Sequence, residues 1–523
     1  MKCTERFILQ CLLASLLFTN LLPLSATAKT VDNSSFKIFI ESRKTNNAST
    51  EQIVHQYKML YTFYEHNNFS PKWFSNIADS GKRNSLQYLL ANADLFALRP
   101  GGFHYTSLSS KKIYNNLKDT FAAEVMYTDA ALSFMHDLAY GGDYNFVRYN
   151  GLKYHPGHLD LISALNNAFN KENFISQLTF VEPNGDKFTC MKEEYLWLLA
   201  VYKSPGFTEI TVKSKEVKLS NTNLVKKLAQ LGYMTVADST ENDLMSALEQ
   251  LQRQHNLLVQ NKINVYCLEV LNQTIAYRLE ELIWNIKWYR WLNGMKDKPH
   301  IVVNIPSNRL TYYEQGISKM ESRMVVGKIS TPTPTLTSEI KNVIYYPYWN
   351  VPHSIAVKEM LPTLKMFPGY LQKLNLEVLL NGRIVSGVNW HGYSSSNFPF
   401  QLRQKPGCNN ALGRLKFEFE NPFHVYLHDT NSKLAFLAGK RYFSHGCMRI
   451  EKPYELAVLL GVDSTKIDMT ECLENKKPQV IPLANPVAVF VIYASIDFVN
   501  GQMQWHEDAY HKIRTQKIFN RSY

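Results

Sequence analysis

The hydrophobic periodicity of this chain changes near Lys298, and that change limits the folds open to it. Before it, apolar residues recur at helical spacing, as Leu279 and Leu282 do. After it, short stretches such as 300–305 and 324–329 alternate as strands do, with prolines marking the loops. A chain of 523 residues has the length for about two to four domains. We therefore expect an α+β multidomain protein with helical regions first and a mainly β domain last.

The helical part divides into three stretches. Residues 29–215 carry helical signals and many aromatic residues without a chemical motif, which is typical of a scaffold. Residues 216–272 contain three short helical segments, and residues 273–297 form one longer connecting helix. Trp288 and Trp291 share a face of that helix. They offer a surface for sugar stacking, but packing between domains is the favoured interpretation.

The β part is expected to span residues 298–480. Residues 353–400 interrupt it with a helical start and a polar Gly/Ser tail. We expect this insert to fold over the site as a lid. Residues 481–523 add strands that complete the β domain or contact the scaffold.

The N-terminus has the pattern of a secretory signal peptide. Lys2 and Arg6 precede an apolar run over residues 7–24, and small residues ending at Ala28 offer a cleavage site. We expect residues 1–28 to be removed on export, and no later apolar run reaches the length of a membrane span. Export makes nucleic acid an unexpected partner. The formal net charge of +12 favours an anionic surface such as a cell wall, or reflects solvating lysines alone.

Five of the seven cysteines lie beyond the signal peptide, so at least one thiol stays unpaired in an oxidising compartment. Cys190, Cys267 and Cys472 are interpreted as small buried hydrophobic residues. Cys408 follows Pro-Gly in a predicted loop and is free to pair or oxidise. Cys447 is the cysteine with reactive surroundings.

The segment Ser444-His-Gly-Cys-Met-Arg449 carries the chemistry. A cysteine becomes a nucleophile when a base is near, and His428 stands nineteen residues before Cys447. Residues 423–430 alternate as a strand, which would place Tyr426 and His428 on one face. A strand ending in His, a loop and a glycine-flanked Cys predict a Cys/His pair in space.

These residues resemble the signature of the L,D-transpeptidase catalytic domain (YkuD-like). The match consists of His428, a spacer, then Ser444, His445, Gly446, Cys447 and Arg449. Further similar segments are 303–306, 326–328, 333–334, 346–352, 412–413 and 426–430. Residues 350–355 and the insert resemble the large YcbB-type subclass, which adds a helical scaffold, a three-helix peptidoglycan-binding domain and a substrate-capping insert. Two positions depart from that pattern: His445 stands where the subclass often has serine, and Asn431 where proline is common.

The resemblance implies a periplasmic peptidoglycan L,D-transpeptidase that needs no cofactor or metal. Its partners would be a tetrapeptide stem as acyl donor and a diaminopimelate amine as acceptor, giving a 3→3 cross-link, and carbapenems would acylate the cysteine. The implied catalytic residues are Cys447 as acyl carrier, His428 as base, Gly446 and Arg449. The implied substrate-binding residues are Tyr426, Ser444, His445, Trp349 and Asn350.

Other interpretations remain open. With water as acceptor the same chemistry gives an L,D-carboxypeptidase, and other amines give a different thiol acyl-transferase. A catalytically idle wall-binding scaffold is a third possibility. His424, His428, His445 and Cys447 are residue types that bind zinc, although their spacing matches no common zinc finger. Arg449 has the alternative of a salt bridge to Glu451.

Overall fold

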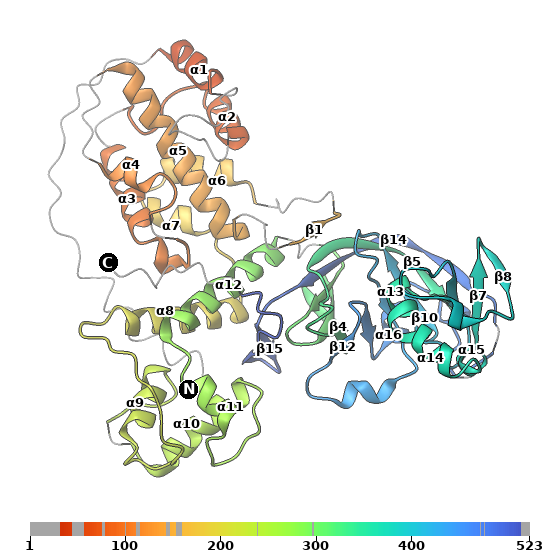
Figure 1. Cartoon of the computed structure of the whole chain (residues 1–523). Helices are drawn as coiled ribbons and strands as arrows, with labels where there is room; N and C mark the ends of the chain where they lie inside the picture. Colours follow the sequence, from red (N-terminus) through yellow and green to blue (C-terminus); the bar gives the residue numbers. More distant parts are fainter. Residues whose placement is uncertain are drawn as a thin grey trace.

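A computed structural model of the chain describes residues 32–43, 57–75, 79–99, 101–110, 116–142, 147–152, 159–237, 239–294, 298–470, 472–474 and 476–513. The expected signal peptide, residues 1–28, lies outside them. A helical region occupies one end, a β-barrel the other, and two further helices cross between them (Figure 1). Among the described helices, none combines the length and the apolar character that a bilayer span requires.

The N-terminal helices pack around one long central helix. They are α1 (Asn33–Glu41), α2 (Tyr57–His66), α3 (Asp79–Ala91), α4 (Tyr105–Ser109), α5 (Leu117–Tyr140), α6 (Leu161–Asn170) and α7 (Phe174–Thr179). Apolar residues from all of them form one core around α5. The buried Glu124 carboxylate of α5 accepts hydrogen bonds from the backbone N–H groups of Trp73 and Phe74, at 2.9 and 3.2 Å. Burial raises the pKa of Glu124 to about 7.

Three short helices follow α8 (Asp186–Tyr202), within the residues where the sequence predicts them. They are α9 (Thr222–Gln230), α10 (Glu241–Gln254) and α11 (Val265–Leu271). Their apolar residues share one core with α8, with α12 (Ile275–Asn293) and with the hairpin of β15 (Ile496–Val499) and β16 (Gln502–Trp505). These helices lie at one end of the molecule below α8 (Figure 1) and share their core with α8, α12 and the hairpin.

The β domain is a closed barrel. Its strands are β2 (His300–Asn304), β3 (Arg309–Glu314), β4 (Ile317–Gly327), β5 (Leu336–Tyr345), β10 (Leu415–Phe419), β11 (Leu427–His428), β13 (Met448–Ile450) and β14 (Gln479–Ile492). The order runs β5-β10-β11-β13-β4-β3-β2-β14, and β14 pairs with both β2 and β5, which closes the sheet. At the edge, β1 (Tyr149–Asn150) from the helical region pairs with β5, and β12 (Tyr442–Ser444) pairs with β4.

The tryptophans of α12 cover the barrel from outside. Trp288 and Trp291 are 1% and 3% exposed, and the Trp291 ring meets Phe490 of β14 edge to face at 5.3 Å. Strand β2 is buried along its whole length as a result, instead of alternating. The prediction that this pair packs between domains is confirmed.

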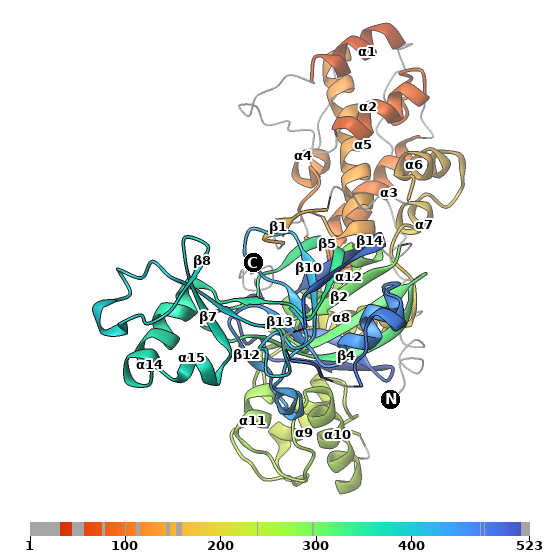
Figure 2. The ribbon, with the colours of Figure 1, turned by 90° about the vertical axis from the view of Figure 1, so that its right-hand side faces the viewer.

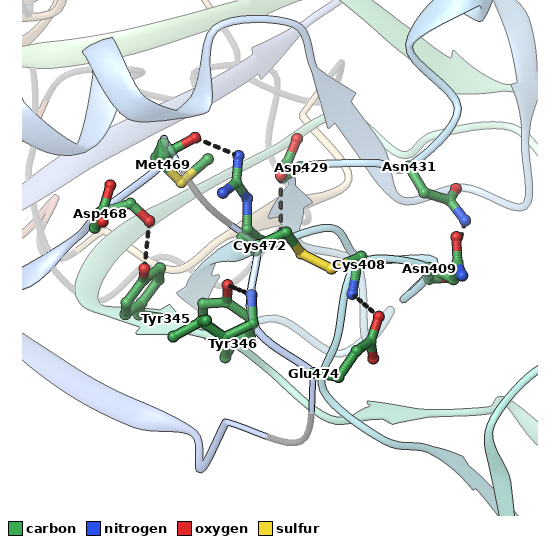
Figure 3. The surroundings of a disulfide bond; sticks show 12 residues. Tyr345, Tyr346, Cys408, Asn409, Asp429, Asn431, Asp468, Met469, Cys472 and Glu474 are labelled. Carbon is green, nitrogen blue, oxygen red and sulfur yellow. Dashed lines mark hydrogen bonds between the residues drawn. A yellow bond between two sulfur atoms is a disulfide. The ribbon is translucent and has the colours of Figure 1, made fainter.

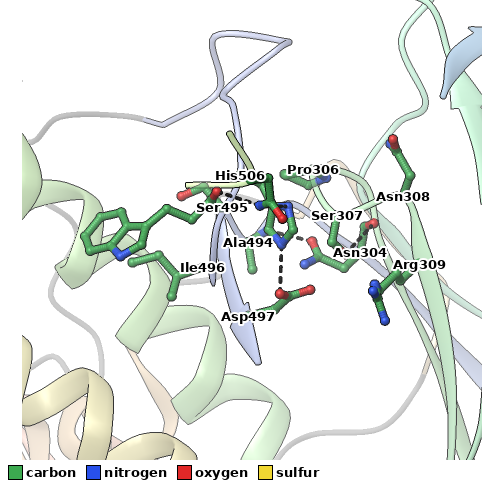
Figure 4. A network of polar contacts seen from close by, with 12 residues as sticks. Asn304, Pro306, Ser307, Asn308, Arg309, Ala494, Ser495, Ile496, Asp497 and His506 are labelled. Atoms are coloured by element: carbon green, nitrogen blue, oxygen red, sulfur yellow. Dashed lines mark hydrogen bonds and ion pairs between the residues drawn. The ribbon is translucent and has the colours of Figure 1, made fainter. Parts of the chain in front are cut away.

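A polar network fixes the turn from β14 into β15 (Figure 4). The Asn304 side chain accepts a hydrogen bond from the Ala494 N–H at 3.1 Å, and His506 contacts Asp497 at 2.7 Å. On the helical side, the Ser495 hydroxyl donates to Glu281 of α12 at 2.6 Å. Barrel, hairpin and helix are thus held together at one point.

The insert forms a small α/β unit beside the barrel (Figure 2). Its sheet has the order β6-β9-β7-β8, from β6 (Trp349–Asn350), β7 (Leu376–Leu380), β8 (Arg383–Val385) and β9 (Gln401–Gln404). Its helices include a π-helical turn, η4 (Ala356–Met360), followed by α14 (Leu361–Met366) and α15 (Tyr370–Lys373). It has its own apolar core, which includes Leu364, Trp390 and Leu402.

A disulfide between Cys408 and Cys472 joins two loops at the base of the insert (Figure 3). The interpretation of Cys472 as a buried hydrophobic residue is therefore wrong, because a cysteine 64 positions away along the chain is folded onto it. Cys190 is only partly buried, whereas Cys267 is buried as a free thiol, as expected.

Replacing both Cys408 and Cys472 by Ala should lower the free energy of unfolding by up to about 4 kcal/mol, because the crosslink closes a loop of 64-residue separation in the unfolded chain. Denaturant unfolding of both proteins, with and without dithiothreitol, measures the difference. With reductant the wild type and the variant should unfold at the same denaturant concentration. Equal stability without reductant would contradict a stabilising role.

Candidate active site

The parallel pairing of β11 with β13 brings the predicted cysteine and histidine together. Leu427 lies opposite Met448 and His428 opposite Arg449, so Cys447 precedes β13 next to Tyr426. The Met448 N–H donates to the Tyr426 carbonyl at 3.0 Å. Since alternate residues of a strand share a face, Tyr426, His428, Cys447 and Arg449 project from the same side of the sheet.

The stretch before His428 is not the regular strand that its alternation predicts. His424 has a φ of +54°, and the Asn421 side chain accepts hydrogen bonds from the backbone of Phe423 and Val425 at 3.1 and 3.2 Å. A turn held by asparagine therefore competes with strand pairing here, and the strand itself is confined to residues 427–428.

His428 is 4% exposed, and its tautomer follows from its contacts. Its Nδ1 lies 2.5 Å from the Asp429 carbonyl oxygen, which can only accept, so Nδ1 carries the proton. Nε2 is then the nitrogen that can accept a proton. Burial, and next the charge of Arg449, lower the pKa of His428 to about 3, so the imidazole is neutral near pH 7.

Asp429 supports this histidine, although its role was not predicted. Its backbone N–H donates to the Leu415 carbonyl at 2.8 Å, and its carboxylate accepts from the Arg414 N–H at 2.9 Å and contacts Lys433. Gly413, at φ +58°, allows this approach, because a Cβ there would lie 2.3 Å from the Asp429 carboxyl carbon. Figure 3 shows Asp429 near the Cys408–Cys472 disulfide.

Cys447 is a partly buried free thiol. Its sulfur lies 4.0 Å from the His424 carbonyl oxygen and within hydrogen-bonding reach of the Tyr426 hydroxyl. Burial raises the pKa of the thiol, while Tyr426, Lys416 and Arg449 act in the opposite direction. With a neutral imidazole beside it, the resting pair is thiol and imidazole and not an ion pair.

The Gly446 conformation and several hydrogen bonds fix the turn before Cys447. Gly446 has a φ of +113°, a conformation that favours glycine. Ser444 is 2% exposed, and its hydroxyl donates to the Cys447 carbonyl at 2.5 Å and accepts from the Gly446 N–H at 3.1 Å. Thr333 donates to the Gly446 carbonyl at 2.8 Å. The Ser444 hydroxyl thus shapes the turn, and its role in substrate binding stays a prediction.

The remaining predicted residues lie on β6, just before β11 and in the turn before β13. Tyr426 has its ring 5.6 Å from that of His428, and Trp349 on β6 is half-buried. Asn350, next on β6, is exposed and pairs with Arg403. His445 binds the insert instead, with Nε2 2.6 Å from the Glu359 carboxylate.

Two cations face the cysteine and histidine. Arg449 is half-buried, and its Nε has no hydrogen-bond partner among the described residues. Glu451 instead binds Arg323, which removes the salt-bridge alternative for Arg449. Lys416, which was not predicted, lies opposite His428 on β10, with Nζ 4.4 Å from the Tyr426 ring centre. Only the pairing of β10 with β11 reveals it.

The arrangement provides a thiol, a neutral base and two cations, of which Lys416 is paired with Glu418 at 2.7 Å. It suits covalent acyl transfer to or from a substrate with a carboxylate near Arg449. Zinc chemistry is not supported, since the described residues contain no group of three His, Cys, Asp or Glu side chains placed to hold a metal.

Replacing His428 by Asn should reduce the acid sensitivity of the fold. In the wild type the folded pKa of about 3 is below the unfolded value of about 6.5, so the stabilisation present above pH 6.5 is lost as the pH falls towards 3. Between pH 7 and pH 4 the wild type should lose roughly 3 kcal/mol more than the variant. Denaturant unfolding across this range measures it, with the exposed His391→Asn as control. Equal slopes for wild type and His428→Asn would refute a buried neutral imidazole.

Family comparisons agree with this site. The family model of the L,D-transpeptidase catalytic domain, YkuD, matches residues 298–469, and that of the Scaffold domain matches residues 58–194. A Haemophilus influenzae protein described as a candidate L,D-transpeptidase is 34% identical over 215 residues, which cover 40% of this chain and 44% of that protein. The chain thus matches less than half the length of this relative.

Two solved structures have looser similarity. The avibactam carbamoyl enzyme of Ldtfm is 14% identical with a TM-score of 0.20, covering 40% of this chain and 61% of its own. A cysteine-to-serine mutant of the Enterococcus faecium L,D-transpeptidase is 13% identical with a TM-score of 0.17, covering 40% and 62%. Superpositions this loose support no inference about the site. The family match carries the conclusion: residues 298–469, with Cys447, His428 and Arg449 on one face, match the L,D-transpeptidase catalytic domain of the YkuD family.

Proposed function

We propose that this protein is a peptidoglycan L,D-transpeptidase that forms 3→3 cross-links through a thioester on Cys447. The observation that carries the proposal is the single sheet face that holds Cys447, Tyr426, His428 and Arg449 within a region matching the L,D-transpeptidase catalytic domain. A thioester conserves the acyl group of the broken amide, so no other energy source is needed for the new bond.

In the first step, Cys447 gives its proton to His428 Nε2 and its sulfur attacks the diaminopimelate carbonyl of a tetrapeptide stem. The C–N bond to the terminal D-alanine breaks, and the departing amine takes the proton from His428. In the second step, the side-chain amine of another diaminopimelate attacks the thioester. It gives a proton to His428, which returns it to the departing thiolate, and the resting thiol is restored.

The surrounding groups have defined tasks in this scheme. The Cys447 N–H and the Tyr426 hydroxyl, which lies at the sulfur, would donate to the developing oxyanion. Gly446 permits the turn that aims the backbone. Arg449 would bind a carboxylate of the stem, because no protein carboxylate among the described residues pairs with its Nε, whereas Lys416 already pairs with Glu418 at 2.7 Å.

The insert would act as the substrate cap. It contacts the turn before Cys447, where the Glu359 carboxylate binds His445. This contact lies two residues from the proposed acyl carrier. Binding to peptidoglycan through α9–α11, export to the periplasm and acylation by carbapenems belong to the same proposal.

Mutation of the catalytic pair tests the reaction. With tetrapeptide muropeptides as substrate, Cys447→Ala and His428→Asn should lower the rate of D-alanine release at least about 1000-fold. Mass spectrometry of the products separates cross-linked dimer from hydrolysed tripeptide, and so a transpeptidase from an L,D-carboxypeptidase. His424→Asn, a nearby histidine outside the proposed chemistry, should retain activity. Neither dimer nor D-alanine from the reduced wild type would leave only an idle wall-binding scaffold.

Lys416 gives a second test. Its charge lowers the pKa of the Cys447 thiol, so Lys416→Gln should raise that pKa and slow alkylation by iodoacetamide about 3- to 10-fold at pH 7.5. The pH dependence of alkylation, followed by mass spectrometry of the Cys447 peptide, reports the shift. Lys341→Gln, which changes an exposed lysine of β5, is the matched control. An unchanged pH profile in Lys416→Gln would show that the Lys416 charge does not lower the pKa of the Cys447 thiol.

A further inference from the structure

A second cleft lies far from the cysteine, and the proposed chemistry does not use it. It has a volume of about 1300 Å³ and opens between α8, α10, the ends of β2 and β3, and the β15–β16 hairpin. It therefore lies where α10 faces α8, the barrel and the β15–β16 hairpin.

Aromatic rings form one part of its lining. Tyr289, Tyr313 and Phe498 all line the cleft and are half-buried. Tyr313 stacks on His300 with ring centres 5.1 Å apart, and Tyr289 packs against Phe188 at 5.8 Å. The rings are thus held in place by neighbours while part of each faces the cleft.

Polar side chains form the facing wall. Ser246, Gln250 and Gln254 follow one another at helical spacing, so a whole face of α10 is turned to the cleft. Gln254 accepts a hydrogen bond from the Tyr233 hydroxyl at 2.8 Å, which orients its amide group. Asn293 and Gln502 add amides from the other sides.

The charge of the cleft differs from that of the chain. Four carboxylates line it, against two cations: Asp186, Glu193, Glu194 and Glu249, with Lys187 and Arg253. The chain as a whole has a formal net charge of +12. Its aromatic, amide and carboxylate groups suit a ligand with many hydroxyls and few charges.

We propose that this cleft binds the sugar backbone of peptidoglycan, a β-linked chain of N-acetylated hexosamines. This inference rests on the proposed function, which supplies the polymer. Tyrosine and phenylalanine rings pack against the apolar faces of sugar rings, while amide and carboxylate groups pair with hydroxyl and acetamido groups.

The cleft is too distant to hold the sugar that carries the reacting stem. Gly316 lines the cleft, and β4 runs from there to Gly327, beside Ser444. Eleven residues of strand span roughly 33 Å. Four extended residues of a stem reach about 14 Å. The bound segment therefore belongs to another part of the glycan, and the cleft keeps the polymer on the enzyme between reactions.

Titration of the full-length protein with a pentamer of β-1,4-linked N-acetylglucosamine tests this inference by calorimetry. Tyr289→Leu and Gln250→Ala should each weaken binding, the tyrosine change by about tenfold. Tyr266→Leu changes a 60% exposed tyrosine on α11 outside the cleft and should bind as the wild type does. Thermal unfolding confirms that each variant is folded.

The outcomes separate this proposal from the catalytic one. Cys447→Ala should bind the pentamer normally, and the cleft variants should still form a carbapenem adduct on Cys447. Absence of pentamer binding, or equal binding by wild type and both cleft variants, overturns the glycan assignment without touching the catalytic site. Binding of a diaminopimelate stem peptide to the cleft, without binding of the sugar pentamer, would overturn the glycan assignment in favour of a cationic peptide ligand. Loss of transpeptidation with normal sugar binding would instead count only against the proposed reaction.

Discussion

The candidate active site depends on the short parallel pairing between β11 and β13. Leu427 and Met448 are fully buried on the inner face, so their partners along each strand must face outward. A slip of one residue would turn Cys447 into the barrel core and bring a methionine to the outer face. The apolar core thus selects the register, and the register brings thiol, phenol, imidazole and guanidinium together.

This pairing is brief, and the rest of the barrel keeps it in place. Strand β10 holds one side of β11, β4 holds one side of β13, and β14 closes the ring through β2 and β5. The same β14 continues into the turn that Asn304 and Ser495 bind to the barrel and to α12. The helical region and the site are therefore connected through β14, and Lys440, in the loop between His428 and Cys447, also lies 6.0 Å from the Tyr266 ring of α11.

The order of helical and β regions and the motif residues were accessible from sequence because they depend on local patterns. The positions of α9 to α12 follow apolar spacing, and the glycine before Cys447 occupies a backbone conformation that suits it. Long-range pairing was not accessible. Lys416 comes to the site only through its register with His428, and Cys472 meets Cys408 only in the fold. At His424 a local asparagine turn overrode the alternation, and at Ser444 burial redirected a hydroxyl to the backbone.

The Cys408–Cys472 bond and the free Cys447 thiol place opposite redox demands on one molecule. Surroundings oxidising enough to form the first also threaten the second with sulfenic acid or mixed disulfides. Oxidants attack the thiolate form of a cysteine. The raised pKa of Cys447 keeps the thiolate fraction small until a substrate arrives. The burial that weakens the resting nucleophile thereby lengthens its chemical lifetime.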